Sequence, residues 1–152
     1  MLDSTDLAII RELVKDGRAS YRSIAKRLGI SVATVASRVT ALEREGVVKG
    51  YTALVDYEKL GYELTAIIEL TISKGKLIEV QRQVAEKPNV SGVYDVTGET
   101  DSIILARFKS RDELNKFVKW LLSIPYVERT LTHLVLGIVK EDPRYPLKAE
   151  DR

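Results

Sequence analysis

Two short segments with helical apolar spacing, joined by a turn that contains glycine, constrain the start of this chain more than any other feature. From Ser20 to Leu28 the apolar side chains recur on one face of a helix, and a second segment with the same period begins at Ser31. Each serine can cap the helix that follows it, and Gly29 stands where the first helix must end. Two helices connected in this way predict a helix-turn-helix.

The sequence on either side completes a larger unit. A helix capped by Asp3 or Ser4 is predicted before the pair. After the pair the apolar period changes to two, and we expect residues 47–55 to form a strand or hairpin with Gly50 near its bend. In a winged helix-turn-helix such a hairpin is the wing. Residues 1–55 are therefore predicted to form one domain of this type, followed by a linker at 56–63.

The rest of the chain contains two copies of a strand-helix-strand pattern. Proline ends each expected helix, at Pro88 and Pro125, and a valine follows two residues later, just before or at the start of the next strand. We expect strands at 64–73, 92–97, 102–108 and 127–139, and helices at 77–86 and around 114–121. The order βαββαβ predicts a ferredoxin-like domain at 64–140, with a charged tail at 141–152. The predicted fold class is α+β.

Charge is concentrated where the helix-turn-helix is expected. The formal net charge is only +2, but seven basic residues stand against two acidic residues between Arg18 and Tyr51. From Gly61 onward the chain carries 14 of each sign. Binding to DNA phosphates needs such a basic surface. Solvated helix faces can have the same composition, so the charge alone leaves DNA binding open.

Composition excludes several kinds of chemistry. The chain has no cysteine and one histidine, His133, which excludes disulfides, thiolate sites and histidine-rich metal clusters. No apolar run approaches the roughly 18 residues that a membrane span requires, and no signal peptide is evident. We expect a cytoplasmic protein that has no cofactor, no metal and no catalytic site.

Several segments together resemble the Lrp/AsnC group of bacterial and archaeal transcription regulators, the feast/famine regulatory proteins. The segments are LDSTD at 2–6, DGR at 16–18, IAKRLG at 24–29, SVATV at 31–35, RVTALEREGVV at 38–48 and GETD at 98–101. The last stands where the family has glycine, aspartate, tyrosine and aspartate. The resemblance covers the chain to about Asp142. It implies a regulator that binds double-stranded DNA, for example the promoter of its own gene, and responds to an amino acid or a related small molecule.

The helix that begins near Ser31 would enter the major groove. By period, Val35, Val39 and Leu42 face inward, and we place Arg38 on the opposite face as the best reader of guanine. Arg38 could instead hold a phosphate or pair with Glu45 or Asp56. The candidate DNA-binding residues are Arg18, Tyr21, Arg22, Lys26, Ser31, Ala33, Thr34, Ser37, Arg38, Arg44 and Lys49.

The resemblance also implies an effector pocket near Gly98, at the contact between dimers. A glycine lets backbone N–H groups approach a carboxylate, and Asp101 offers a charge for an ammonium group. The candidate effector-binding residues are Thr97, Gly98, Glu99, Thr100, Asp101, Thr130 and Thr132. The same loop composition is also typical of a plain hairpin turn. We interpret His133 as an interface or surface residue.

Helices on one face of a four-stranded sheet would leave the other face open. The last strand carries apolar residues on both faces, which predicts a partner over the open face. The resemblance implies a homodimer that assembles into an octamer.

Three alternatives stay open. An architectural protein that coats DNA without sequence preference would show the same basic surface. A regulator could respond only to its own concentration. Some haem-biosynthesis decarboxylases acting on sirohaem are similar in both domains, although they are expected to use histidine, of which this chain has one.

Overall fold

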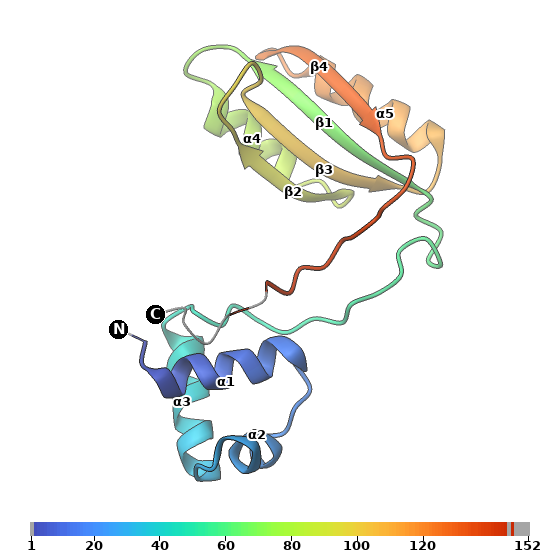
Figure 1. The fold of residues 1–152 in the computed structure, drawn as a ribbon. Helices are drawn as coiled ribbons and strands as arrows, with labels where there is room; N and C mark the ends of the chain where they lie inside the picture. The colour runs from blue at the N-terminus through green and yellow to red at the C-terminus, as the bar shows by residue number, and fades with distance from the viewer. Residues whose placement is uncertain (1, 146, 148–152) are drawn as a thin grey trace. The chain divides into compact units, whose positions relative to one another are not determined.

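The structure, a computed structural model, describes residues 2–145 and 147 and divides into two units (Figure 1). Of the described residues, those up to Leu54 and those from Lys140 onward form one unit, and Val55–Val139 form the other. The first contains helices α1 (Ser4–Lys15), α2 (Tyr21–Leu28) and α3 (Val32–Arg44). Among residues 2–145 and 147, no helix is both long and apolar enough to cross a membrane.

Side-chain caps define where the three helices begin. Asp3, Ser20 and Ser31 each accept a hydrogen bond from the backbone N–H three residues later. This confirms the serine caps and selects Asp3 over Ser4. Gly29 ends α2 with φ of 68°, a left-handed conformation that favours glycine, and so turns the chain into α3 within a few residues.

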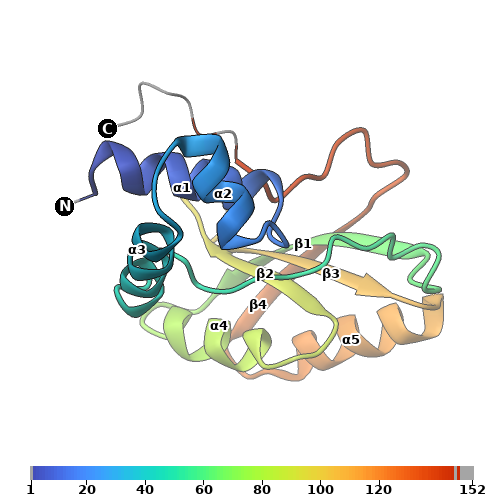
Figure 2. The ribbon, with the colours of Figure 1, turned by 90° about the horizontal axis from the view of Figure 1, so that it is seen from below.

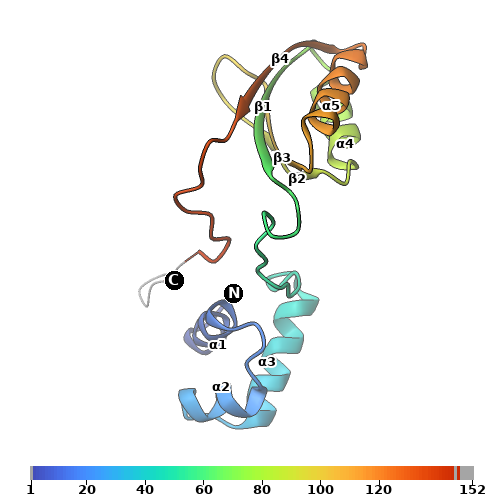
Figure 3. The same ribbon diagram turned by 90° about the vertical axis from the view of Figure 1, so that its right-hand side faces the viewer.

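The three helices lie close together (Figure 3) and contribute side chains to one core. Ile9 of α1, Ile24 of α2 and Val35 and Val39 of α3 are fully buried. Ile24, Val35 and Val39 belong to the stripes predicted for α2 and α3. The stripe predicted for α1, at Leu7, Ile10, Leu13 and Val14, is shifted: Ile9 and Leu13 are buried, whereas Leu7, Ile10 and Val14 are only partly buried. Because the side chains are apolar and come from all three helices, burying them holds the helix-turn-helix together.

The predicted hairpin at 47–55 does not form, and that prediction is wrong for this structure. The N–H groups of Val47 and Val48 both donate to the Leu42 carbonyl and so complete the end of α3. Those donors are then not available for a strand ladder. The segment that follows is exposed at every residue from Lys49 to Val55, and a two-stranded hairpin with so little packing is marginal in water.

The second unit is a four-stranded antiparallel sheet with two helices on one face (Figures 2 and 3). The strand order is β2-β3-β1-β4. The elements are β1 (Leu64–Ile72), α4 (Leu77–Ala85), β2 (Val90–Asp95), β3 (Ser102–Phe108), α5 (Arg111–Ser123) and β4 (Val127–Leu134). This is the predicted βαββαβ order.

The sheet separates a buried face from an open one. In β1, Ala66, Ile68, Leu70 and Ile72 are buried, as the alternation predicts. They pack with α4 and α5 residues such as Val80, Val84 and Leu121. Ile78 of α4 is 63% exposed. It lies next to Leu77 but points away from the sheet, because neighbouring helical residues are about 100° apart.

The last strand is shorter than the sequence predicts. It ends at Leu134 rather than Val139. Leu134 is opposite Ala66, and the Val135 N–H donates to the Thr65 carbonyl. β1 begins one residue earlier, so the residues after Val135 have no strand to pair with. Leu136, predicted to lie on a strand face, is 99% exposed.

The segment predicted as a linker, 56–63, is grouped with the second unit. Within that unit the Tyr57 ring lies 4.6 Å from the Arg107 guanidinium, and Tyr62 packs edge-on against Tyr57 at 6.1 Å. Lys109 lies 5.0 Å from the Tyr62 ring. These contacts attach the segment to one end of β3.

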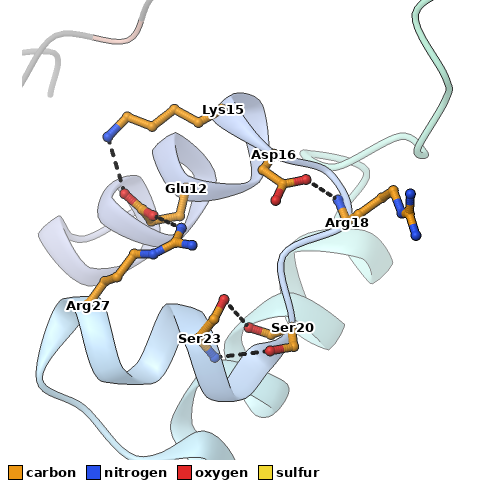
Figure 4. A network of polar contacts seen from close by, with 7 residues as sticks. All are labelled: Glu12, Lys15, Asp16, Arg18, Ser20, Ser23 and Arg27. Atoms are coloured by element: carbon orange, nitrogen blue, oxygen red, sulfur yellow. Dashed lines mark hydrogen bonds and ion pairs between the residues drawn. The ribbon is translucent and has the colours of Figure 1, made fainter.

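An ion-pair network fastens α2 to α1 inside the first unit (Figure 4). Glu12 of α1 accepts from Arg27 of α2 at 2.6 Å and from Lys15 at 3.2 Å. The Arg27 hydrogen bond, followed by Lys15, holds the pKa of Glu12 below its ordinary value of 4.5, although desolvation opposes the shift.

This network makes the first unit sensitive to acid. A lowered folded-state pKa means that the stabilisation is present above pH 4.5 and is lost as pH falls through the folded pKa of Glu12. We expect the free energy of unfolding, measured by urea titration of the helical signal, to decrease as pH falls through that interval. In the Glu12→Gln variant part of this acid dependence should disappear. Equal acid dependence in both proteins would show that the network does not contribute.

Candidate nucleic-acid interface and ligand loop

The exposed face of α3 is a stripe of four residues. Ala33, Ser37, Thr40 and Arg44 are exposed and recur every three or four positions. They lie opposite the buried residues Val35, Val39 and Leu42. We call these four residues the recognition face. Thr40 is not among the residues predicted from the sequence, although its spacing of three from Ser37 and four from Arg44 could have identified it.

At the start of α3, the side chains of Ser31 and Thr34 form the helix cap. The Thr34 N–H donates to Ser31 Oγ at 3.0 Å, and the two hydroxyl oxygens lie 2.8 Å apart. Ser31 therefore caps the helix, which is one of the two roles predicted for it; the other is DNA binding. Thr34 is half-buried, and its hydroxyl is directed to the cap rather than away from the helix.

Arg38 does not lie on the face opposite the core, and that placement is corrected here. It follows Val35 by three positions and precedes Leu42 by four, so it shares their side of the helix. Its Nη1 lies 2.6 Å from Asp3 Oδ2 and 3.1 Å from Asp6 Oδ1. The ion-pair partners named from sequence, Glu45 and Asp56, were wrong.

Five basic side chains between Arg18 and Tyr51 are exposed and form no ion pair with the described residues 2–145 and 147: Arg18, Arg22, Lys26, Arg44 and Lys49. We call them the free basic set. Arg27 and Arg38 are instead neutralised by α1. Figure 4 shows the Arg18 guanidinium pointing away from the Glu12 network. Its backbone N–H donates to Asp16 Oδ1 at 2.9 Å, which fixes the turn that carries it.

Two tyrosines of the first unit, Tyr51 and the DNA-binding candidate Tyr21, differ in their contacts. The Tyr51 hydroxyl donates to Glu43 at 2.9 Å. Burial, followed by the Glu43 carboxylate, raises the pKa of Tyr51 to about 12. Tyr51 therefore stays neutral and fastens the segment after α3 to that helix. Tyr21 is exposed at the first position of α2.

The loop at 97–101 is anchored to β1 at its far end. The Thr100 hydroxyl donates to the Leu70 carbonyl at 2.8 Å, and Asp101 Oδ2 accepts from the Ile72 N–H at 2.7 Å. Gly98 has φ of 125°, which strains any other residue, and open space surrounds it. Thr97, Gly98 and Glu99 are exposed, so the first half of the loop is accessible, whereas the second half is hydrogen-bonded to β1.

β4 places the two predicted threonines beside β1, the strand that anchors the loop. Thr130 is opposite Leu70 and Thr132 is opposite Ile68, and both threonines are half-buried. The structure thus places Thr100 and Asp101 on one side of β1 and Thr130 on the other, around Leu70. Thr132 lies two residues further along the strand.

The open face of the sheet combines apolar and polar groups. Ile67 of β1 and Leu131 of β4 are exposed there, and His133 Nε2 lies 2.8 Å from Glu69 Oε1. The Tyr94 ring of β2 lies over Gly92, where a Cβ would approach its hydroxyl to 2.6 Å. The predicted position of His133 on an exposed face is confirmed.

Two family models match the chain and agree with these two units. A winged helix-turn-helix DNA-binding model matches residues 2–49, and the Lrp/AsnC ligand binding domain matches residues 65–145. The chain belongs to the Lrp/AsnC family. It therefore combines a DNA-binding helix-turn-helix with an Lrp/AsnC ligand-binding domain, as the resemblance implied.

Relatives within this family span nearly the whole chain. An uncharacterized HTH-type transcriptional regulator of Pyrococcus abyssi is 49% identical and covers 95% of this chain and 98% of its own length. The HTH-type transcriptional regulator FL11 of Pyrococcus horikoshii is 40% identical, with 97% of each chain covered.

Solved structures share the fold. The complex of a Neisseria meningitidis transcriptional regulator with L-Met is similar with a TM-score of 0.86 and 30% identity, covering 96% of this chain and 97% of that one. Escherichia coli AsnC is similar with a TM-score of 0.84 and 24% identity, covering 93% of this chain and 96% of its own. The Lrp/AsnC chain described here thus has the two-domain organisation of proteins known from crystals.

Proposed function

We propose that this Lrp/AsnC protein is a sequence-specific regulator of transcription whose DNA affinity is modulated by an amino acid or a related small molecule. The observation that carries the proposal is the free basic set in the same compact unit as the recognition face. Those charges can neutralise phosphates, and Ser37, Thr40 and Arg44 can reach base edges. Tyr21 and the cap at Ser31 and Thr34 lie at the first turns of α2 and α3, where backbone N–H groups favour phosphate.

The second unit supports a sensing and assembly role. The exposed first half of the loop, with Thr97 and Glu99, and the threonines Thr130 and Thr132 across β1 offer hydroxyls and a carboxylate to a ligand with an ammonium group, while Thr100 and Asp101 hold the loop to β1. Pairing of two open sheet faces would give a homodimer, and dimers would assemble into an octamer. A two-fold symmetric dimer predicts a roughly palindromic DNA site.

The first experiment selects bound fragments from the sheared genome of the source organism at physiological salt and sequences them. Enrichment of a palindromic motif, above all upstream of this protein's own gene, is the expected result. Retention of fragments without any motif would instead support the architectural alternative. Failure to retain DNA at any salt concentration would overturn the proposal.

The selected fragment then tests the effector. Each of the common amino acids is added separately, and DNA affinity is measured by fluorescence anisotropy. We expect one chemical class of amino acid to change the affinity. If none does, and binding follows protein concentration alone, the regulator works without a small ligand. Incubation with sirohaem followed by an absorbance scan tests the enzymatic alternative, and we expect no spectral change.

Lys49 offers a single-site test of phosphate binding. We expect Lys49→Ala to weaken binding to the selected fragment and to random DNA alike, and to reduce the slope of log K against log salt by about 0.9. A charge that contacts only phosphates carries no sequence information. Lys74→Ala, an exposed lysine of the second unit, is the matched control and should change neither quantity. A loss of affinity for the selected fragment but not for random DNA would contradict the assignment of Lys49 to phosphate binding.

A further inference from the structure

Arg38 joins the middle of α3 to the first turn of α1 through a closed set of polar contacts. Asp3 Oδ1 accepts the Asp6 N–H at 2.9 Å, and Asp6 Oδ2 accepts the Asp3 N–H at 3.0 Å. The remaining oxygens, Asp3 Oδ2 and Asp6 Oδ1, both face Arg38 Nη1, at 2.6 and 3.1 Å. The helix cap of α1 and the ion pair to α3 are therefore one cluster.

This cluster fixes the orientation of α3 relative to α1, which the apolar core alone does not do. Burial of Ile9, Ile24, Val35 and Val39 holds α1, α2 and α3 together, but apolar contact is not directional and tolerates small rotations of α3. A guanidinium held by two carboxylates sets both the rotation and the axial position of the helix that carries it. The Asp6 side chain is only 10% exposed, so it has little access to water in place of Arg38.

The charges in the cluster are mutually stabilised. Hydrogen bonding to Asp3 is the main reason that the pKa of Arg38 lies above its ordinary value. The pKa of Asp3 lies below its ordinary value, mainly because of the Asp6 N–H and then because of Arg38. Arg38 thus meets two acidic partners, whereas Arg44 on the recognition face pairs with none of the described residues.

We propose that Arg38 is a positioning residue for DNA recognition: it orients the recognition face of α3 through Asp3 and Asp6, and it contacts neither base nor phosphate. This inference rests on the proposed function, since it concerns how the same helix meets DNA. It assigns the base-reading role to Ser37, Thr40 and Arg44 instead.

The test compares two arginines of the same helix. Affinity for the selected fragment is measured over a range of salt for the unmodified protein, Arg38→Ala and Arg44→Ala. We expect Arg38→Ala to lose about tenfold in affinity with an unchanged salt slope, because no counterion release depends on it. Arg44→Ala should reduce the slope by about 0.9 or relax one base position.

Variants that change the acidic partners of Arg38, and a conservative change of Arg38 itself, complete the test. The double variant Asp3→Asn, Asp6→Asn keeps oxygen acceptors for the helix cap but removes both charges. If Arg38 positions α3, this variant should lose affinity as Arg38→Ala does, and combining all three changes should cost no more than either alone. Arg38→Lys should recover part of the affinity.

Destabilisation by itself is controlled with Ile9→Val, which removes one buried methylene group and no polar contact. This variant should bind DNA like the unmodified protein when all variants are measured below their unfolding transitions. The inference is overturned if the aspartate double variant binds as tightly as the unmodified protein, or if Arg38→Ala reduces the salt slope or relaxes one base position. Failure of the unmodified protein to prefer any fragment would instead defeat the proposed function.

Discussion

Replacing the five residues of the free basic set with alanine is expected to remove most of the DNA affinity of this protein. The changes are Arg18→Ala, Arg22→Ala, Lys26→Ala, Arg44→Ala and Lys49→Ala. If each side chain neutralises one phosphate, the slope of log K against log salt falls by roughly 4.5. That slope corresponds to about a 500-fold change in affinity between roughly 50 and 200 mM salt. The variant should therefore bind weakly, with little dependence on salt.

The structural basis of this prediction is selective pairing. Arg27 and Arg38 carry the same charge as the five but already meet carboxylates of α1. Only the unpaired side chains can exchange solution counterions for DNA phosphates. Anisotropy titrations on the selected fragment and on random DNA would measure the slopes.

A control with the same charge change comes from the second unit. Five exposed basic residues there are replaced together: Lys59, Lys74, Arg82, Arg111 and Lys119. We expect this control to keep most of the salt slope. A similar loss of slope in both variants would show that net charge, and not the surface of the helix-turn-helix, drives binding.

Phe108→Ala is expected to cause the largest loss of stability, about 3–5 kcal/mol in the free energy of unfolding of the second unit. Phe108 is 1% exposed at the end of β3, and its ring centre lies 5.3 Å from that of Phe117. Phe117 in turn lies 5.6 Å from Trp120. Removing the first ring leaves a cavity beneath α5 and breaks this aromatic row.

Urea unfolding followed by tryptophan fluorescence measures this effect, because Trp120 is the only tryptophan of the chain and lies in the second unit. Leu122→Ala, on the exposed side of the same helix, is the control and should change the free energy by less than about 0.5 kcal/mol. A loss below about 1 kcal/mol for Phe108→Ala would contradict the role given to the aromatic row. All variants are compared at one protein concentration, since assembly would also stabilise the fold.

Local chemistry made much of the fold predictable. A serine before an apolar stripe predicted the starts of α2 and α3, and Gly29 predicted the end of α2, because caps depend only on nearby backbone groups. Strict alternation along β1 predicted its buried face for a similar reason: successive side chains of a strand point to opposite sides.

The failures occurred where a residue depends on a distant partner. The 47–55 segment has strand-like spacing, but two of its N–H groups complete α3. β4 stops at Leu134 because β1 begins only two residues before Ala66, the partner of Leu134, and leaves the residues beyond without a paired strand. Thr100 and Asp101 resemble free loop residues in the sequence, yet β1 ties both of them down.

Arg38 has one property that the sequence predicts and another that only the folded structure specifies. Its position three after Val35 already places it on the core side of α3, and the sequence contains that information. Its partners, Asp3 and Asp6, are more than thirty positions away, and only the packing of α1 against α3 brings them within hydrogen-bonding distance. Periodicity and capping act over one helical turn, so they are readable along the chain. Ion pairs between helices and the ends of paired strands depend on three-dimensional packing, and only the folded structure specifies them.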